Sequence, residues 1–194
     1  MDTLIGLVGK DYVLVAADAS QAFSIIAMKT DEDKMVEVED KKVMAIAGEA
    51  GDRAQFGAFI QKNLKLRFLR TGLPLSTKST AHFVRSELAT FLRQNPYMVN
   101  LLIAGYDEVD GPSLYYLDYL ASMQKMEAAS HGHGSAMVLS TMDAHYKPGM
   151  ELEDGIRVLK MAISEVKKRF LIAQPKFIVK VVDAGGVRVL EDVF

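Results

Sequence analysis

Cysteine is absent from the 194-residue sequence, and long apolar runs are absent as well. Without cysteine the chain forms no disulfides, offers no thiolate metal ligands and has no cysteine nucleophile. None of the apolar runs approaches the roughly 18 residues that span a membrane. The first residues also lack the basic segment, apolar stretch and cleavage site of a secretory leader. We therefore expect a cytoplasmic and nuclear protein without a membrane segment.

Neither sign of charge is in clear excess. Lys and Arg number 23 and Asp and Glu number 25, so the formal net charge is −2. Nucleic acids and anionic membranes attract a basic face, and this balance gives no indication of one. With 49% hydrophobic and 25% charged residues, the composition is that of a globular protein. No repeat, low-complexity segment or linker divides the sequence, so we predict a single domain over residues 1–194.

Apolar residues begin almost at the first position. Residues 4–8 and 12–17 are apolar and flank a turn at residues 9–11. This pattern predicts a β-hairpin whose first strand begins at the third or fourth residue, although chain starts are usually poorly ordered. Further strands are predicted at residues 23–29, 34–40 and 42–49.

Helical periodicity follows these strands. From about residue 52 to residue 70, apolar residues recur every three or four positions, and Gly72 is a stop signal. A second helix is predicted with Thr77 or Ser79 as its cap and with its end before Pro96. Later in the chain, a short helix is predicted at residues 132–146 and a long amphipathic helix at 151–170.

The other apolar segments predict two pairs of strands. They are residues 97–107 and 113–123, and residues 176–183 and 187–194. We interpret the glycines at 185–186 as a hairpin turn, because a phosphate-binding loop needs a strand–loop–helix setting. Clustered strands joined by short turns favour antiparallel sheets, and pairs of helices can cover their outer faces. The sequence therefore predicts an α+β fold, a four-layer α-β-β-α sandwich with two mostly antiparallel sheets.

Six short segments carry a resemblance to a known family. They are VLVAAD (13–18), DKM (33–35), AIAGEAGD (45–52), LLIAGYDE (101–108), LYYLDY (114–119) and HGHGSA (131–136). In this order and spacing they resemble proteasome beta subunits, which are N-terminal nucleophile hydrolases, and the likeness runs from end to end. Within that family the sequence is most similar to the type-2 beta subunits, at the fourth position of the beta ring. The resemblance implies the same four-layer fold.

Active members of this family use an N-terminal threonine as the nucleophile. Its hydroxyl attacks a peptide carbonyl, its free amine accepts the proton, and a backbone N–H stabilises the oxyanion. By the resemblance, Asp18 and Lys34 match the family's aspartate and lysine, and Gly48 matches the oxyanion glycine. The position of the threonine falls on Asp2, which has no hydroxyl.

Three further positions differ from the family's catalytic pattern. By the resemblance, a serine falls on His133, and a late aspartate and serine fall on Phe170 and Ala173. Phenylalanine accepts no hydrogen bond and alanine donates none through its side chain, and losing a proton-transfer group typically lowers a rate by about 10²–10⁴-fold. We therefore interpret the chain as a non-catalytic subunit in which Asp18 and Lys34 remain as a buried ion pair.

Two alternatives stay open at this point. Removal of the first two residues would expose the amine of Thr3 and give an active threonine peptidase, but Thr3 is one position out of register and would face the other side of its strand. A stand-alone binding protein on the same fold is the second alternative. No metal site is predicted, because His131 and His133 are too few ligands for zinc. Asp143 and His145 are another possible pair of metal ligands because they are near each other in sequence, but they lie across a predicted helix.

The resemblance also implies a role and partners. It implies a structural subunit of the 20S proteasome core without a cofactor, acting in protein degradation that is ubiquitin-dependent when regulators cap the core. Its neighbours would be beta subunits of the same and the opposite ring and subunits of the alpha ring, through contacts on the order of 2,000 Å² or more. Candidate surfaces are residues 114–123 and 134–146. A non-catalytic member of the family needs no propeptide to shield a threonine. This expectation fits a first strand that needs no leader segment before it.

Overall fold

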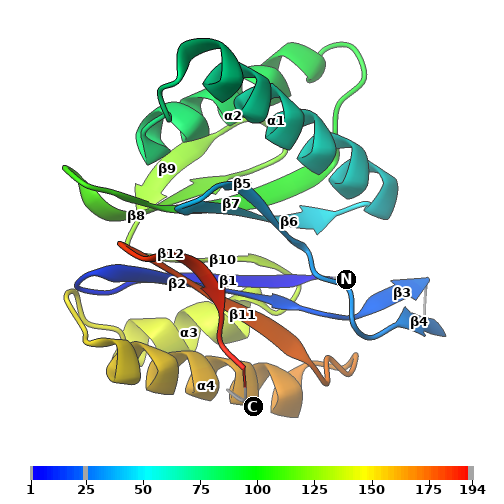
Figure 1. Cartoon of the computed structure of the whole chain (residues 1–194). Coiled ribbons are helices and arrows are strands. Elements are labelled where there is room, and N and C mark those ends of the chain that lie inside the picture. Colours follow the sequence, from blue (N-terminus) through cyan, green and yellow to red (C-terminus); the bar gives the residue numbers. More distant parts are fainter. Residues whose placement is uncertain (1, 24–25, 192–194) are drawn as a thin grey trace.

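Two five-stranded sheets are stacked between two pairs of helices in the computed structural model, which describes residues 2–23 and 26–191 (Figure 1). Every strand pairing among these residues is antiparallel. The predicted four-layer α+β sandwich is therefore confirmed. No helix in the described part of the chain is long and apolar enough to cross a bilayer.

The first sheet is built around the predicted N-terminal hairpin. Its strands, in spatial order, are β10 (Ala128–Gly132), β1 (Thr3–Val8), β2 (Tyr12–Asp18), β11 (Phe177–Asp183) and β12 (Gly186–Val189). In the β1–β2 turn, the Gly9 N–H donates to the Tyr12 carbonyl over 2.8 Å. Every residue of β1 and β2 is buried, because this sheet has a helix layer on one face and the second sheet on the other.

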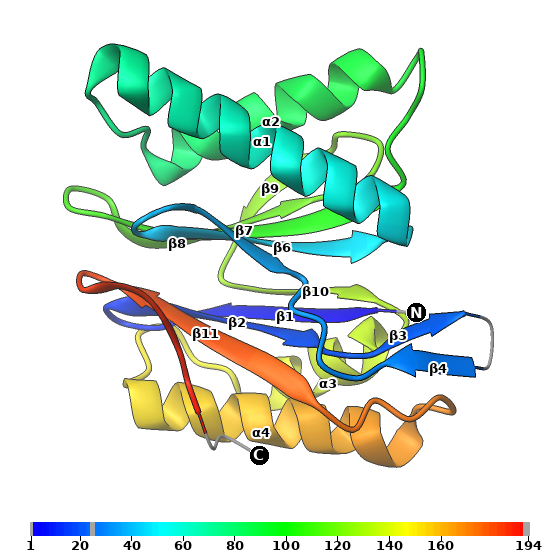
Figure 2. The ribbon, with the colours of Figure 1, turned by 45° about the vertical axis from the view of Figure 1, so that its right-hand side comes forward.

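The second sheet faces the first and follows the chain order without a crossover. Its strands are β5 (Met35–Glu39), β6 (Lys42–Gly48), β7 (Val99–Asp107), β8 (Gly111–Leu117) and β9 (Met123–Met126). A separate two-stranded hairpin, β3 (Gln21–Phe23) and β4 (Ile26–Lys29), extends from the side of the sandwich (Figure 2).

Each sheet carries its own pair of helices, as Figure 2 shows. The pairs are α1 (Ala50–Thr71) with α2 (Thr77–Phe91) on the second sheet, and α3 (Ser135–His145) with α4 (Leu152–Arg169) on the first. As predicted, α1 stops at Gly72, which takes the left-handed conformation at φ 67° and donates its N–H to the Phe68 carbonyl. The predicted caps of α2 are wrong: Ser76 is the cap, and its hydroxyl accepts from the Ser79 N–H.

Three apolar layers fill the sandwich, and the side chains of β1, which alternate between the two faces of the sheet, contribute to two of these layers. Ile5 and Leu7 point towards α3 and α4, whereas Leu4 and Val8 point between the two sheets. A third layer packs the second sheet against α1 and α2. Because side chains alternate along a strand, the residue before β1 must point between the sheets, and Thr3 must point towards the helices.

The strand predicted at residues 113–123 is the largest error in the expected topology. β8 ends at Leu117, and Asp118 then closes a turn by accepting hydrogen bonds from the N–H groups of Leu120 and Ser122. Ala121 has a positive φ of 62°, which no continuous strand accommodates. After this turn come two strands that were not predicted, β9 and β10, and β10 crosses to the first sheet to pair with β1.

Smaller differences concern strand ends. The single strand predicted at residues 23–29 is instead the β3–β4 hairpin, and residues 24–25 lie outside the described residues. The strand predicted from residue 97 begins at Val99. The final strand covers Gly186–Val189, and residues 192–194 of the predicted segment lie outside the described residues.

Candidate functional site

The residues matched to the family's catalytic site meet at the beginning of β1. Asp2 is 6% exposed, and its carbonyl accepts the His133 N–H over 3.1 Å, which holds it against the end of β10. Its side chain lies between the two sheets, on the side that strand alternation requires. There it meets Lys34, which precedes β5, and Gly48, which ends β6.

A buried lysine joins two carboxylates. The Lys34 ammonium lies 2.7 Å from Oδ1 of Asp2 and 3.0 Å from Oδ2 of Asp18, and it donates a third hydrogen bond to the Ser20 carbonyl over 2.7 Å. All three ammonium protons therefore have acceptors. The structure brings Asp2, Asp18 and Lys34 together as one charge cluster rather than the simple Asp18–Lys34 pair that we expected from the sequence.

The second oxygen of the Asp2 carboxylate takes the backbone donor that the resemblance assigns to an oxyanion. The Gly48 N–H lies 2.8 Å from Oδ2 of Asp2, and Nη1 of Arg53 lies 3.1 Å from the same oxygen. Arg53 also donates to the Gly48 carbonyl over 3.0 Å and to Glu32 over 2.8 Å. If Gly48 has the role that the resemblance implies, a carboxylate of the chain itself occupies the place where a substrate oxyanion would be stabilised.

Arg53 and Glu32 were not among the residues singled out from the sequence. An arginine in the first turn of a helix is usually solvent-exposed, whereas Arg53 is 8% exposed. The sequence signal that could have indicated Arg53 is its closeness to Gly48 in the segment GEAGDR. A helix that begins directly after a strand can place side chains of its first turn beside the end of that strand. Sequence spacing alone did not reveal that Asp2 would supply the anion.

The two buried carboxyls respond differently to this environment. Burial would raise the pKa of Asp2, but the Lys34 ammonium, the Gly48 N–H and the Arg53 guanidinium together hold this pKa below its usual value. Burial raises the pKa of Asp18, as does the charge of Asp2, and Lys34 and the Thr3 N–H oppose the change without cancelling it. Asp2 is therefore the carboxyl that remains an anion as the pH falls.

Thr3 faces the opposite side of β1, as the register argument predicts. Its hydroxyl donates to Oε1 of Gln174 over 2.8 Å and is fully buried, while its N–H donates to Oδ1 of Asp18 over 2.8 Å. Gln174, a residue not expected from the sequence, is 2% exposed. The hydroxyl of Thr3 thus lies on the helix side of the sheet, away from the Gly48 N–H.

The other three matched positions are His133, Phe170 and Ala173. The rings of His133 and Phe170 have centroids 6.4 Å apart, and Phe170 packs against the apolar layer under α3 and α4. Ala173 is exposed in the segment between α4 and β11. Where the family pattern has two hydroxyls and a carboxylate, this chain has two rings and a methyl group.

His131, which was considered as a metal ligand, instead links the two sheets. Its Nε2 donates to the Leu101 carbonyl on β7 over 3.2 Å, and its ring stacks on Tyr116 at a centroid distance of 3.9 Å. Among the described residues, no three His, Asp or Glu side chains gather as a metal site would require.

The pH dependence of stability should contain a contribution from His131. Burial lowers its pKa to about 4 from the model-peptide value of 6.5, so between these values the unfolded chain binds a proton that the native chain does not. Stability from this group is complete above pH 6.5 and declines as the pH falls towards 4, by about 3 kcal/mol in total. Urea unfolding at several pH values between 7 and 4 measures the decline.

His131→Gln is the matched control for this decline. The variant keeps a neutral hydrogen-bond donor near Leu101 but has no group that titrates in this range, so its stability should fall less steeply between pH 6.5 and 4. The carboxyls contribute equally to both proteins. An unchanged slope in the variant would show that His131 does not cause the loss.

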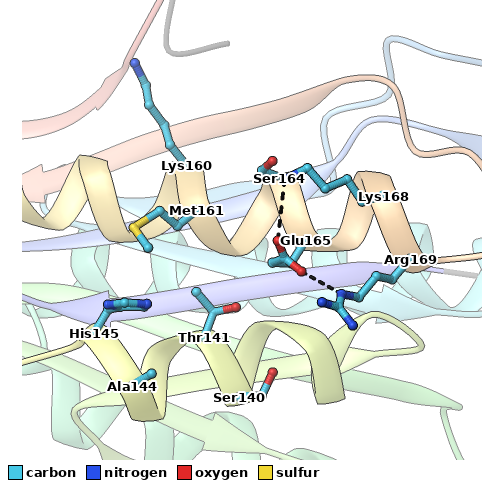
Figure 3. A pocket seen from close by; sticks show the side chains of 10 residues that line it. All are labelled: Ser140, Thr141, Ala144, His145, Lys160, Met161, Ser164, Glu165, Lys168 and Arg169. Carbon is cyan, nitrogen blue, oxygen red and sulfur yellow. Dashed lines mark hydrogen bonds and ion pairs between the residues drawn. The ribbon is translucent and has the colours of Figure 1, made fainter.

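A shallow groove lies elsewhere, between α3 and α4 (Figure 3). Glu165 on its wall pairs with Arg169, whose Nε is 2.6 Å away, and with Lys168 at 3.6 Å. Ser140, Thr141 and His145 also line the groove, but Ser140 and Thr141 donate their hydroxyls to the Met137 carbonyl. The groove therefore presents no activated nucleophile.

Comparison with known proteins identifies the family. The sequence profile of the proteasome family, described as proteasome subunit, matches residues 1–182. Proteasome subunit beta type-2 of Oryza sativa subsp. japonica is 49% identical over 188 residues, which cover 97% of this chain and 89% of the rice protein. Beta type-2-B of Arabidopsis thaliana is 47% identical, with 97% and 94% covered, and beta type-2 of Dictyostelium discoideum is 46% identical, with 98% and 97% covered.

The comparisons confirm the predicted resemblance to the type-2 beta subunits. The family forms a threonine protease complex that degrades proteins, and its beta subunits assemble with other proteasome subunits in the 20S core. This chain belongs to the proteasome beta-subunit family.

Proposed function

We propose that this chain is a non-catalytic, structural subunit of the 20S core particle. The observation that supports this proposal is the Asp2 carboxylate, which accepts hydrogen bonds from the Gly48 N–H and the Lys34 ammonium at the position that the resemblance matches to the nucleophile. Asp2 has no hydroxyl to attack a carbonyl, and its negative charge repels a developing oxyanion. The subunit then completes the beta ring and walls the proteolytic chamber, in degradation that is ubiquitin-dependent when regulators cap the core.

The proposed partners are beta subunits of the same and the opposite ring and subunits of the alpha ring, in the cytoplasm and the nucleus. Of the candidate contact segment 114–123, Leu114 and Leu117 are fully buried, so its exposed apolar part is Tyr119 and Leu120. On α3 the large apolar side chain that is exposed is Leu139. Apolar side chains that remain exposed in the isolated chain are suited to permanent subunit contacts.

A covalent probe tests the proposal directly. An epoxyketone that reacts with N-terminal threonines should label active subunits of the purified particle and leave this subunit, of 21.4 kDa, unlabelled. Mass spectrometry of each separated subunit gives the result. An adduct on this subunit would contradict the proposal.

The same measurement decides the alternative of an active peptidase trimmed to Thr3. That alternative needs Thr3 Oγ1 to leave Gln174 and reach the Gly48 side of β1, which requires the first residues of the strand to turn over. A probe adduct whose mass places it on Thr3 would establish the alternative. Finding the chain outside the particle, as a monomer by native mass spectrometry, would instead favour a stand-alone binding protein.

A further inference from the structure

Three donors from three separate segments converge on one carboxylate. The Lys34 ammonium, the Gly48 N–H and the Arg53 guanidinium lie 2.7, 2.8 and 3.1 Å from oxygens of Asp2. Lys34 is 3% exposed and Arg53 is 8% exposed, so both cations act where water screens them little. Charge-assisted hydrogen bonds of this kind are the strong ones in proteins.

Each of these donors is also held by other groups. Lys34 is bound to Asp18 and to the Ser20 carbonyl, and Arg53 is bound to Glu32 and to the Gly48 carbonyl. The Gly48 N–H is fixed by the pairing of β6 with β7 and by a positive φ of 138°. The donors would therefore keep their places if the Asp2 carboxylate were removed.

We propose that Lys34, Gly48 and Arg53 form a carboxylate-binding site, that Asp2 is its internal ligand, and that a small free carboxylate binds there when the Asp2 side chain is shortened. In the natural chain, the covalent link gives the Asp2 carboxylate a very high effective concentration. External anions are therefore excluded, and the site is closed. Its ligand class is a planar monoanion with two oxygens, because one oxygen meets Lys34 and the other meets Gly48 and Arg53.

The inference rests on the proposed function in one respect, that an acid and not a nucleophile stands at residue 2. Its test measures anion binding, whereas the covalent probe measures nucleophilic reactivity. Failure of the anion test therefore leaves the non-catalytic role standing. An adduct on Thr3 would contradict the non-catalytic role and would mean that the mature chain has lost Asp2 as its internal ligand, but it would not change the outcome of the anion test on the full-length variants.

Ligand size gives the proposal a sharp test. Asp2→Ala removes the carboxylate but keeps Cβ, so the space left is that of formate, and the methyl group of acetate would overlap Cβ. Asp2→Gly removes Cβ as well, so its space is that of acetate. The first variant should prefer formate to acetate, and the second should bind acetate at least as well as formate.

The measurement is the thermal midpoint of the full-length chain in sodium formate, acetate or chloride at matched ionic strength. Both variants should melt below the natural chain in chloride, since Gly48 and the two cations lose a partner. Formate at ten times its dissociation constant should raise the midpoint of Asp2→Ala by about 3–6 °C in a saturable way. The natural chain should melt alike in all three salts.

Two further variants separate binding at this site from a general salt effect. Asp2→Asn fills the same space with an amide and should show no saturable response. Arg53→Gln in the Asp2→Ala background should weaken formate binding at least tenfold, because it removes one of the two cations. An equal response to chloride, or to formate in Asp2→Asn, would overturn the proposal.

Folding of the shortened variants is checked by the same ligand. If Asp2→Ala is unfolded in chloride, recovery of its circular dichroism with formate but not acetate supports the proposal, and no recovery at any formate concentration overturns it. For a folded variant, line broadening of ¹³C-formate measures binding directly, and a line as sharp as with the natural chain contradicts the site.

Discussion

Lys34→Met should lower the free energy of unfolding by roughly 3–5 kcal/mol, the cost of leaving a buried charge without its partner. Methionine fills the space of the lysine stem, so the loss comes from charge and hydrogen bonding. Without the ammonium, the Asp2 and Asp18 carboxylates face each other at 6% and 0% side-chain exposure, and the Ser20 carbonyl loses its donor. Urea unfolding at pH 7 measures the difference.

The pH dependence of this difference identifies its cause. In the variant, burial and mutual repulsion raise the pKa of the Asp2–Asp18 pair above that of the unfolded chain. A carboxyl with a raised pKa destabilises the native state at neutral pH, and this penalty is relieved as the pH falls through the raised value. The gap between Lys34→Met and the natural chain should therefore be largest near pH 7 and should shrink towards pH 4.

Lys10→Met is the matched control, because the Lys10 ammonium also lies 2.8 Å from a carboxylate oxygen, that of Glu151. The Lys10 and Glu151 side chains are 58% and 70% exposed, and an exposed pair contributes little. The control should unfold as the natural chain does. If Lys34→Met were as stable as Lys10→Met at pH 7, the charge cluster would have no structural role.

Local patterns predicted most of this fold because each depends on a short stretch of chain. The β1–β2 hairpin follows from two apolar segments around Gly9, and α4 follows from one apolar stripe. Both elements bury the residues that their periodicity assigns to the interior. The layer order then follows from the succession of strands and helices along the chain.

β10 could not be predicted in this way. Its sequence AASHG has little strand propensity, and its partner β1 lies more than a hundred residues earlier in the chain. The strand forms because Ala129 packs between the sheets, because the Ser130 hydroxyl donates to the Leu4 carbonyl, and because His131 reaches Leu101 on the second sheet. These are tertiary contacts, which a local pattern does not contain.

The candidate site, too, could be predicted from the sequence only in part. The positions of Asp18, Lys34 and Gly48 followed from resemblance to the family, and the register of Thr3 followed from strand alternation. The role of Asp2 as an acceptor for the Gly48 N–H did not, because it depends on how the two sheets stack: the residue before β1 of the first sheet meets the end of β6 in the second, and Arg53 contacts both Asp2 and the Gly48 carbonyl. These are tertiary contacts between segments far apart in the sequence.

Gly132→Ala should be among the most damaging single changes in the chain, with an expected loss of roughly 3–5 kcal/mol from backbone strain and overpacking together. Gly132 ends β10 with a positive φ of 90°, and an added Cβ would lie 1.8 Å from the Asp2 carbonyl oxygen. This atom is backbone, so no rotamer change relieves the overlap. Relief requires β1 and β10 to separate at their ends, which moves Asp2 away from Lys34 and Gly48.

Gly72→Ala separates the two sources of this loss. Gly72 also has a positive φ, 67°, but a Cβ there would meet no atom within 4 Å. Its cost should be only that of a left-handed alanine, about 1–2 kcal/mol. Thermal unfolding of both variants gives the comparison, and similar losses would mean that the close approach of Gly132 to Asp2 adds nothing. A much larger loss for Gly132→Ala would instead show that the Asp2 carbonyl lies too close to β10 to admit a Cβ at residue 132, so that the position of Asp2 beside the Gly48 N–H requires a glycine there.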